Sequence, residues 1–455
     1  MPISDRPVPI LATAGPAWLD GFAAITADGG VAVPLSPAYP AEELAWFADD
    51  VGADTVVMSD DLAAHGEALA RGRRVVRLAE LTGQGRTGAD PLAGPPAQPA
   101  LILYTSGTTG KPKGAVLSRG NLVAQTDILA RAWAIGPGDR MVHALPLHHL
   151  HGLVVALLTA HRAGAHVLLL PRFDAARVIA ALEAERATLW MAVPTMYHRL
   201  RELTERDTDA ADALRGAAER LRLATSGSAA LPVGLAGWWR DLHGAIPLER
   251  YGMTEIGIAL ANPLDRSTRR AGSVGWPLPT VEIRLVGDDG ADASAGPGEL
   301  RVRGPSVFGG YWQRPEASAS AFAGDWFRTG DLAQRDADGC VRLLGRASID
   351  ILKSAGFKIS ALEIEEVMRE HPSVAEVAVI GVPDEALGQR VVAAVIARAG
   401  AAPASDELHA FARARLPGYK APREVILVAD FPRTPLGKVQ KSELLRSLAG
   451  RLATG

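Results

Sequence analysis

Short apolar segments alternate with amphipathic segments along the first half of the chain. In residues 173–187 the spacing is helical, since Val178, Ala181 and Leu182 share one face and charged residues take the other. This alternation predicts an α/β fold in which helices cover a mostly parallel sheet. The strand-like segments are four or five residues long and aliphatic or β-branched, and they span residues 32–35, 55–58, 100–104, 166–170 and 189–193.

The pattern changes at about residue 281. Residues 281–286 and 299–303 alternate in polarity between Gly, Pro and Asp turns, which predicts a β-rich subdomain that ends near Leu344. We therefore expect a boundary at residues 345–350, with a large N-terminal domain over 1–345 and a small α+β domain over 346–455. Within the small domain we expect helices at 361–370 and 406–416 and strands at 374–382, 390–396 and 424–428.

Composition excludes several classes of protein. With 22% charged residues and a net charge of −3, the chain has no general attraction to nucleic acid or anionic lipid. Cys340 is the only cysteine, which excludes an intrachain disulfide and fits a reducing compartment, so we expect a cytoplasmic protein. The longest apolar stretch, residues 153–160, is far shorter than the roughly 20 residues that cross a bilayer, and no signal peptide is recognisable, so no membrane role is expected.

The segment YTSGTTGKPKG at residues 104–114 directly follows an apolar strand. Its glycines let backbone N–H groups approach phosphate oxygens, its hydroxyls add donors, and its lysines add positive charge. The spacing is not that of a Walker loop, and so many hydroxyls make a solvated turn the weaker interpretation. We predict a phosphate-binding loop formed by Thr105, Ser106, Gly107, Thr108, Thr109, Gly110, Lys111 and Lys113.

Other polar residues suggest nucleotide chemistry. Glu255 is a hard oxygen ligand of the kind that Mg²⁺ prefers, although alone it would be taken for a surface carboxylate. Asp331 could bind both ribose hydroxyls, and Arg346 could contact ribose or phosphate. Lys438 could stabilise the negative charge that builds when a carboxylate attacks an α-phosphate. His148, His149 and His151 lack the accompanying ligands of a metal site, so no metal is assigned to them.

In this order along the chain, these segments resemble the motifs of the adenylate-forming superfamily, which contains acyl-CoA synthetases, luciferases and peptide-synthetase adenylation domains. The motifs are YTSGTTGKPKG, LPLHHLHG at 145–152, SGSAALP at 226–232, YGMTE at 251–255, WFRTGD at 326–331, GR at 345–346 and PLGK at 435–438. The resemblance implies a carboxylate–CoA ligase that uses ATP, Mg²⁺ and coenzyme A and proceeds through an acyl-adenylate.

The resemblance also assigns roles. Lys438, Glu255, Thr105 and His149 would be catalytic, with Glu255 and Thr105 also binding Mg²⁺. The nucleotide would contact the phosphate loop and, beyond it, Ser228, Ala229, Glu249, Arg250, Tyr251, Gly252, Met253, Thr254, Asp331 and Arg346. Lys353, Ser354, Gly356 and Lys358 would line the pantetheine tunnel after the mobile small domain rotates. The hinge residue would be either Ser348 or Asp350.

The acid substrate is predicted from arginines and from further resemblance. Arg199 and Arg270 are expected to hold a second carboxylate, with a surface salt bridge as the alternative for each. The runs around Met196, Ser226 and Glu255 resemble those of bacterial malonyl-CoA synthetases, which implies malonate or methylmalonate, and His151 would line the acyl pocket. The alternatives are a ligase for other short or medium-chain acids, an adenylation enzyme that loads a separate carrier protein, and a non-catalytic binding protein.

The resemblance also implies a short N-terminal region. Family members usually carry several dozen residues before the segment at 29–40, and fewer than thirty precede it here. We therefore expect an N-terminally short large domain that keeps the active-site motifs.

Overall fold

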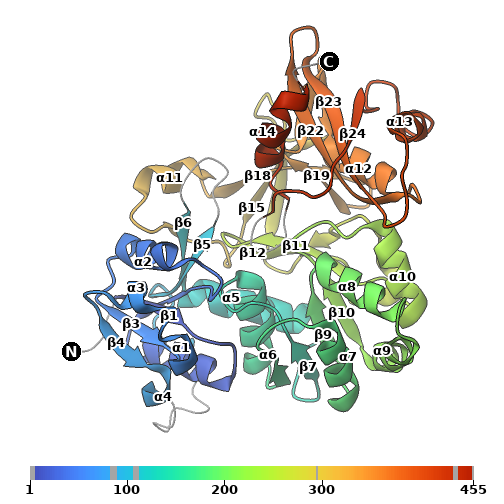
Figure 1. The fold of residues 1–455 in the computed structure, drawn as a ribbon. Coiled ribbons are helices and arrows are strands. Elements are labelled where there is room, and N and C mark those ends of the chain that lie inside the picture. The colour runs from blue at the N-terminus through green and yellow to red at the C-terminus, as the bar shows by residue number, and fades with distance from the viewer. Residues whose placement is uncertain (1–5, 82–89, 106–111, 294–295, 434–438, 453–455) are drawn as a thin grey trace. The chain divides into compact units, whose positions relative to one another are not determined.

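The computed structural model describes residues 6–81, 90–105, 112–293, 296–433 and 439–452 (Figure 1). The chain forms two compact units. The larger consists of residues 1–231, 235–283 and 302–328, and the smaller of residues 232–234, 284–301 and 329–455. The two units are described separately below, and the predicted domain boundary at residues 345–346 stays a prediction.

The first sheet of the larger unit has seven strands in the order β16-β6-β5-β2-β1-β3-β4. Its central strands are parallel, and β6 and β16 add antiparallel strands at one edge. The strands are β1 (Pro7–Leu11), β2 (Val31–Pro34), β3 (Thr55–Met58), β4 (Arg74–Arg77), β5 (Pro99–Thr105), β6 (Lys113–Ser118) and β16 (Gly310–Tyr311). The associated helices are α1 (Pro16–Ala27), α2 (Ala41–Asp50), α3 (Glu67–Ala70), α4 (Leu78–Leu81) and α11 (Pro315–Ser320).

The second sheet also has seven strands, in the order β13-β12-β11-β10-β9-β7-β8. The strands from β8 to β11 are parallel, and β12 and β13 are antiparallel. They are β7 (Arg140–His143), β8 (His166–Leu169), β9 (Leu189–Ala192), β10 (Leu223–Ser226), β11 (Leu248–Met253), β12 (Gly257–Ala261) and β13 (Trp276–Pro277). The helices in this region are α5 (Arg119–Ala132), α6 (Thr159–Arg162), α7 (Ala175–Ala184), α8 (Pro194–Thr204), α9 (Thr208–Arg220) and α10 (Val233–His243), together with a π-helix (His151–Leu158).

The predicted elements of this unit are confirmed to within three residues, the largest difference being at the end of α7. Helix α7 begins after Asp174, whose side chain accepts a hydrogen bond from the backbone N–H of Arg177, and it buries Val178 and Leu182 as the pattern predicted. Strands β3, β5 and β9 are almost wholly buried, which explains why they appear as continuous apolar runs rather than alternating ones. No helix in the described ranges is long and apolar enough to cross a membrane.

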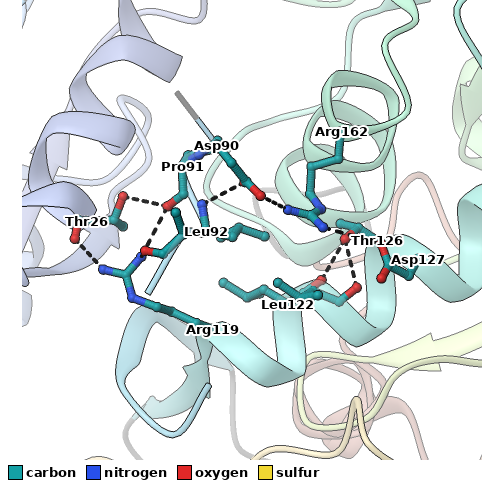
Figure 2. Close-up of polar contacts among 11 residues, drawn as sticks. Thr26, Asp90, Pro91, Leu92, Arg119, Leu122, Thr126, Asp127 and Arg162 are labelled. Carbon is teal, nitrogen blue, oxygen red and sulfur yellow. Dashed lines mark hydrogen bonds and ion pairs between the residues drawn. The ribbon is translucent and has the colours of Figure 1, made fainter. Parts of the chain in front are cut away.

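A buried arginine joins several elements of the larger unit (Figure 2). Arg119, at the start of α5, is 3% exposed, and its guanidinium donates hydrogen bonds to the backbone carbonyl groups of Thr26 and Pro91. The Thr26 hydroxyl donates to the same Pro91 carbonyl at 2.8 Å. Beside it, Asp90 forms an ion pair with Arg162 of α6. The segment that begins at Asp90 is therefore held among α1, α5 and α6.

A third sheet has five strands and contains the β-rich segment expected after residue 281. Its order is β14-β15-β18-β17, and β19 pairs with β18. The strands are β14 (Glu282–Val286), β15 (Gly298–Arg303), β17 (Phe322–Ala323), β18 (Trp326–Arg335) and β19 (Val341–Arg346).

Residues 351–452 of the smaller unit form an α+β sandwich, as predicted. Its sheet has the order β21-β20-β23-β22, with β24 parallel to β23. Helices α12 and α13 pack on one face through Ile364 and Leu408, and α14 packs on the other through Leu444. The elements are β20 (Ile351–Ser354), β21 (Phe357–Ser360), α12 (Ala361–Arg369), β22 (Val374–Asp384), β23 (Gly388–Ala397), α13 (Ser405–Arg413), β24 (Glu424–Leu427) and α14 (Lys441–Leu452).

Candidate active site

Glu255 lies in the tight connection between β11 and β12. A β-carbon at Gly252 would overlap the carbonyl oxygen of Gly257, so only glycine lets the two strands approach this closely. The register of the two strands also shifts between Tyr251 and Gly252, and such an irregularity changes the direction of the strand just before the connection. The backbone N–H of Phe308 donates to the Glu255 carbonyl at 2.8 Å and fixes this segment further. The position of Glu255 is thus set by its backbone surroundings.

The carboxylate of Glu255 lies beside hydroxyl groups from two other elements, β5 and β16. It is 6% exposed, and its Oε1 accepts a hydrogen bond from the Tyr311 hydroxyl at 2.9 Å and lies 3.5 Å from the Thr105 hydroxyl. Thr105 ends β5 and pairs with Lys113 at the start of β6, whose ammonium lies 5.3 Å from the centre of the Tyr311 ring. Carboxylate and hydroxyl oxygens are the ligands that Mg²⁺ prefers. The two predicted magnesium ligands are therefore adjacent and chemically suited to the ion.

Two predicted catalytic segments fall on residues that the structure leaves out. Ser106, Gly107, Thr108, Thr109, Gly110 and Lys111 lie outside the described residues, and so does Lys438. Their roles stay predictions. The described flanks of the second segment are joined, because Arg433 and Val439 form an isolated antiparallel β-bridge.

A buried arginine lies close to Gly227 and interacts electrostatically with His151 of the histidine motif. Arg250 in β11 is 4% exposed, and a β-carbon at Gly227 would overlap its guanidinium. Its Nε and Nη2 atoms are buried and, among the described residues, have no hydrogen-bond partner. The same holds for the hydroxyls of Thr225 and Ser226 and for Nε2 of His151. Buried polar atoms without partners are rare in proteins and suggest that a ligand completes them.

The histidines next to this arginine are uncharged at neutral pH. Burial lowers the pKa of His149 to about 4, and burial together with the nearby Arg250 cation lowers the pKa of His151 well below its usual value. Burial also lowers the pKa of Arg250 to about 9, which still leaves it protonated at neutral pH. Nδ1 of His151 lies 3.4 Å from the Ser228 hydroxyl. The positive charge at this place thus comes from Arg250.

The residues predicted to surround the nucleotide base lie at the ends of β10 and β11. Ser228 adopts a left-handed backbone conformation with φ of 67°, which is strained for a residue other than glycine and typical of functional sites. Ser228 and Ala229 are exposed, whereas Tyr251 is buried. The buried carboxylate of Glu249 accepts a hydrogen bond from the Gly272 N–H at 3.1 Å. Gly252, Met253 and Thr254 are partly buried.

The predicted substrate residues have different environments. Met196 in α8 is 7% exposed and His151 is equally buried, but Arg199 is exposed on the same helix as Met196. Arg270 is also exposed, and its guanidinium lies 5.2 Å from the centre of the Trp276 ring. Neither arginine has the desolvated surroundings on which its assignment depended. Their binding of a second carboxylate stays a prediction.

In the smaller unit, two predicted ribose contacts are brought together. Asp331 and Arg346 pair across β18 and β19, and the Asp331 carboxylate lies 3.1 Å from the Arg346 guanidinium. Lys353, Ser354, Gly356 and Lys358 lie in the β20–β21 hairpin, whose turn has left-handed backbone at Gly356 with φ of 82°. Of the two hinge candidates, Ser348 is exposed, whereas Asp350 accepts hydrogen bonds from the backbone N–H of Arg346 and from Lys441. The choice between them stays open.

The family is established by comparison with known proteins. Residues 4–312 match the AMP-binding enzyme family, and residues 363–438 match the AMP-binding enzyme C-terminal domain. The chain belongs to the AMP-binding enzyme family. The predicted membership of the adenylate-forming superfamily is thereby confirmed.

Relatives of this AMP-binding enzyme include a mitochondrial malonate–CoA ligase of Mus musculus, which is 43% identical over 459 residues that cover 92% of this chain and 78% of that protein. ATP-bound MatB from Rhodopseudomonas palustris has the same fold, with a TM-score of 0.87 and 34% identity over 98% of this chain and 89% of that one. A malonyl-CoA ligase in a ternary product complex with methylmalonyl-CoA and AMP gives a TM-score of 0.68 and 41% identity over 94% and 90% of the two chains.

Sequence reasoning missed two features of the site in this AMP-binding enzyme. Tyr311 contacts Glu255 from the two-residue strand β16, which pairs with β6 although almost 200 residues separate them. No local pattern marks so short a strand. Arg250 was assigned to the nucleotide because it lies within the ERYGMTE run. Only its burial and its Nε and Nη2 atoms, which lack a partner among the described residues, suggest an acyl-pocket role.

Proposed function

We propose that this AMP-binding enzyme is an ATP-dependent malonate–CoA ligase that also accepts 2-substituted malonates such as methylmalonate. The observation that carries the proposal is the buried guanidinium of Arg250, whose Nε and Nη2 lack partners in the described part of the chain. A buried guanidinium without a counter-ion is unfavourable, and a carboxylate can satisfy it with two parallel hydrogen bonds. The names of the relatives, malonate–CoA ligase and malonyl-CoA ligase, support the same acid.

The reaction has two steps. A carboxylate oxygen of malonate attacks the α-phosphorus of ATP, the bond from that phosphorus to pyrophosphate breaks, and malonyl-adenylate forms. The thiol of coenzyme A then loses its proton and attacks the acyl carbon, and the bond from that carbon to the AMP oxygen breaks. Malonyl-CoA and AMP are the products. The distal carboxylate of malonate takes no part in either step and is free to bind Arg250.

In this proposal, the residues of the site have different roles in adenylate formation. Glu255 and Thr105 would hold Mg²⁺, which neutralises part of the charge on the phosphates when it is bound. Lys438 stabilises the negative charge shared by the attacking carboxylate and the α-phosphate. His149 is uncharged at neutral pH, because burial lowers its pKa, and can donate a hydrogen bond to the reacting carboxylate.

The smaller domain serves both steps in this proposal. Its first residue, Arg346, binds the ribose together with Asp331, which precedes the domain. Rotation of residues 346–455 then removes Lys438 after adenylation and brings the β20–β21 hairpin to the pantetheine of coenzyme A.

The proposal is tested by ATP–pyrophosphate exchange with malonate, methylmalonate, acetate and octanoate, followed by assay of thioester formation with free coenzyme A. We expect exchange with the two dicarboxylates to exceed exchange with the monocarboxylates by at least 30-fold, because losing a charge-assisted pair in a desolvated pocket costs about 2–5 kcal/mol. Equal exchange with octanoate would favour a medium-chain ligase. Exchange without thioester formation would favour an enzyme that loads a carrier protein.

Three arginine variants identify the residue that binds the distal carboxylate. Arg250→Met should lower kcat/KM for malonate by roughly 30-fold or more and leave activity with butyrate unchanged or higher. Arg199→Met and Arg270→Met are matched controls, since each removes the same charge from an exposed position. A loss of malonate activity confined to either control would move the assignment back to that arginine.

The cytoplasmic location stays a prediction.

A further inference from the structure

A buried ion cluster surrounds the first residue of α14 in the smaller unit. The ammonium of Lys441 lies 2.6 Å from Oδ1 of Asp350 and 2.7 Å from Oε1 of Glu365. The side chains of the three residues are only 11%, 16% and 5% exposed. Burial alone would lower the pKa of Lys441, but the charges of Glu365 and Asp350 outweigh it and raise the pKa. Lys441 is therefore a charged lysine held by two carboxylates.

Each carboxylate of the cluster also binds a second structural element. Oδ2 of Asp350 accepts a hydrogen bond from the backbone N–H of Arg346 at 3.1 Å. Oε1 of Glu365 accepts from the backbone N–H of Val379 in β22 at 2.9 Å, and its Oε2 binds the Arg369 guanidinium at 3.0 Å. The cluster therefore joins the end of β19, helix α12, strand β22 and the start of α14.

Stability alone does not explain a lysine at this position. The first turn of a helix carries partial positive charge, so a lysine there is less favourable than a neutral or acidic residue. Burying an ion pair is also costly, and apolar residues of similar size often give equal or greater stability. A residue type that lowers the stability of the fold at its position is expected where that residue serves function.

In the sequence, the cluster directly follows the segment 434–438, which carries Lys438. Lys441 is three residues after Lys438, a span of at most about 11 Å along the chain. The described flanks of that segment are also fixed, since Arg433 pairs with Val439 and the backbone N–H of Gln440 donates to the Pro432 carbonyl at 2.8 Å. Asp350 in turn fixes the backbone of Arg346, the residue that pairs with Asp331.

We propose that Lys441 is a positioning residue for adenylation: paired with Asp350 and Glu365, it fixes the backbone of Arg346 and the start of α14, three residues after Lys438 in the sequence. The inference rests on the proposed function, in which Lys438 stabilises the charge of the first step. It adds a role for three residues that are not assigned above to ATP, coenzyme A or the acid. Because the second step does not use Lys438, the cluster should matter for adenylation and little for thioester formation.

The test is Lys441→Met, assayed separately in each half-reaction with whichever acid the parent enzyme uses. We expect ATP–pyrophosphate exchange to fall at least tenfold through kcat, with KM for ATP within about twofold, while thioester formation from a chemically prepared acyl-adenylate stays within twofold. Lys441→Arg should restore part of the loss, because it keeps the charge. Exchange within twofold of the parent, or equal loss in both half-reactions, would overturn the proposal.

A matched control and a second variant keep the test decisive. Lys420→Met removes another lysine that pairs with α12, since the Lys420 ammonium lies 2.7 Å from the Glu363 carboxylate, and it should leave exchange unchanged. If Lys441→Met does not fold, Glu365→Gln replaces it, since Asp350 still balances Lys441; the same selective loss of exchange is required. A parent enzyme that shows no exchange with any acid would instead reject the proposed function, which separates the two failures.

Discussion

At Glu255, a carboxylate is buried against the hydroxyls of Tyr311 and Thr105 in a place fixed by the β11–β12 connection. Each hydroxyl can donate only one hydrogen bond, whereas a bound cation would balance the negative charge of the carboxylate and favour its ionised form. This arrangement suits a site that is completed by Mg²⁺ together with the phosphates of ATP.

Glu255→Gln should therefore lower the rate of adenylation by at least a hundredfold and raise the Mg²⁺ concentration needed for half-maximal exchange, because the amide is neutral and a weaker metal ligand. The measurement is ATP–pyrophosphate exchange as a function of Mg²⁺ concentration. Tyr311→Phe is the control, since it removes the neighbouring hydroxyl and keeps the carboxylate. If Glu255→Gln keeps the Mg²⁺ dependence of the parent, Glu255 is not the metal ligand.

The buried histidines predict how stability depends on pH. Burial lowers the pKa of His143 and of His149 to about 4, whereas the unfolded chain binds protons near pH 6.5. Below pH 6.5 the unfolded state takes up protons that the folded state does not, so the free energy of unfolding should fall by about 1.4 kcal/mol per pH unit for each histidine. Urea unfolding at pH 7.5 and 5.5 measures the loss.

The pH prediction has a direct control in His149→Gln. This variant should lose about 1 kcal/mol less between pH 7.5 and 5.5 than the parent, because one titrating group is gone. Identical losses in the two proteins would show that His149 titrates normally when folded.

The individual site residues show what a sequence can and cannot reveal. Glu255, Asp331 and Arg346 could be selected because their residue types suit metal or ribose binding and their motifs occur in a known order. Burial, however, depends on neighbours that are distant in the chain. Arg250 is desolvated because β11 lies between β10 and β12, whereas Arg199 and Arg270, which are equally close to motifs, are exposed.

At the scale of helices and strands, the sequence predicted most of what the structure contains. Buried parallel strands such as β3 and β9 lie within continuous aliphatic or β-branched runs, and amphipathic helices such as α7 have their apolar spacing, so both follow from local sequence. The two-residue strand β16 and the π-helix His151–Leu158 do not, because distant pairing or an altered hydrogen-bond pattern creates them.

The arrangement of the elements around Arg119 predicts a stability effect. Arg119→Met should lower the free energy of unfolding by about 2–4 kcal/mol, because the carbonyl groups of Thr26 and Ala93 lose their donor in a buried place. Arg131→Met, on the exposed part of the same helix, should change it by less than about 0.5 kcal/mol. Urea unfolding of both variants is the measurement, and equal values would show that the Arg119 contacts contribute little.

At the scale of the whole molecule, the proposal requires one chain to perform two reactions with different parts of its smaller domain. Lys438 would serve adenylation only, and the turn at Gly356 would serve thioester formation only. Substitutions at these two positions should therefore give opposite defects, which a single rigid active site would not produce.

Lys438→Ala should lower adenylation by several orders of magnitude and leave thioester formation from a prepared adenylate nearly unchanged. Gly356→Leu should do the reverse and let adenylate accumulate, because its bulk would obstruct the pantetheine. Gly356→Asn is its control, since asparagine tolerates the left-handed backbone with a smaller side chain. Both half-reactions are measured for each variant, by exchange and by thioester formation.

Mixing the two defective enzymes gives the sharpest form of this prediction. Gly356→Leu should release adenylate slowly, and Lys438→Ala should convert it to thioester, so the mixture should form acyl-CoA at a low rate that rises with the concentration of the second enzyme. The double variant at the same total concentration should form none, because neither of its half-reactions works. If each single variant instead lost both half-reactions equally, the mixture would also be inactive. That result would mean that Lys438 and Gly356 support the same conformation of the enzyme. The proposal that the smaller domain alternates between two conformations would then have to be abandoned.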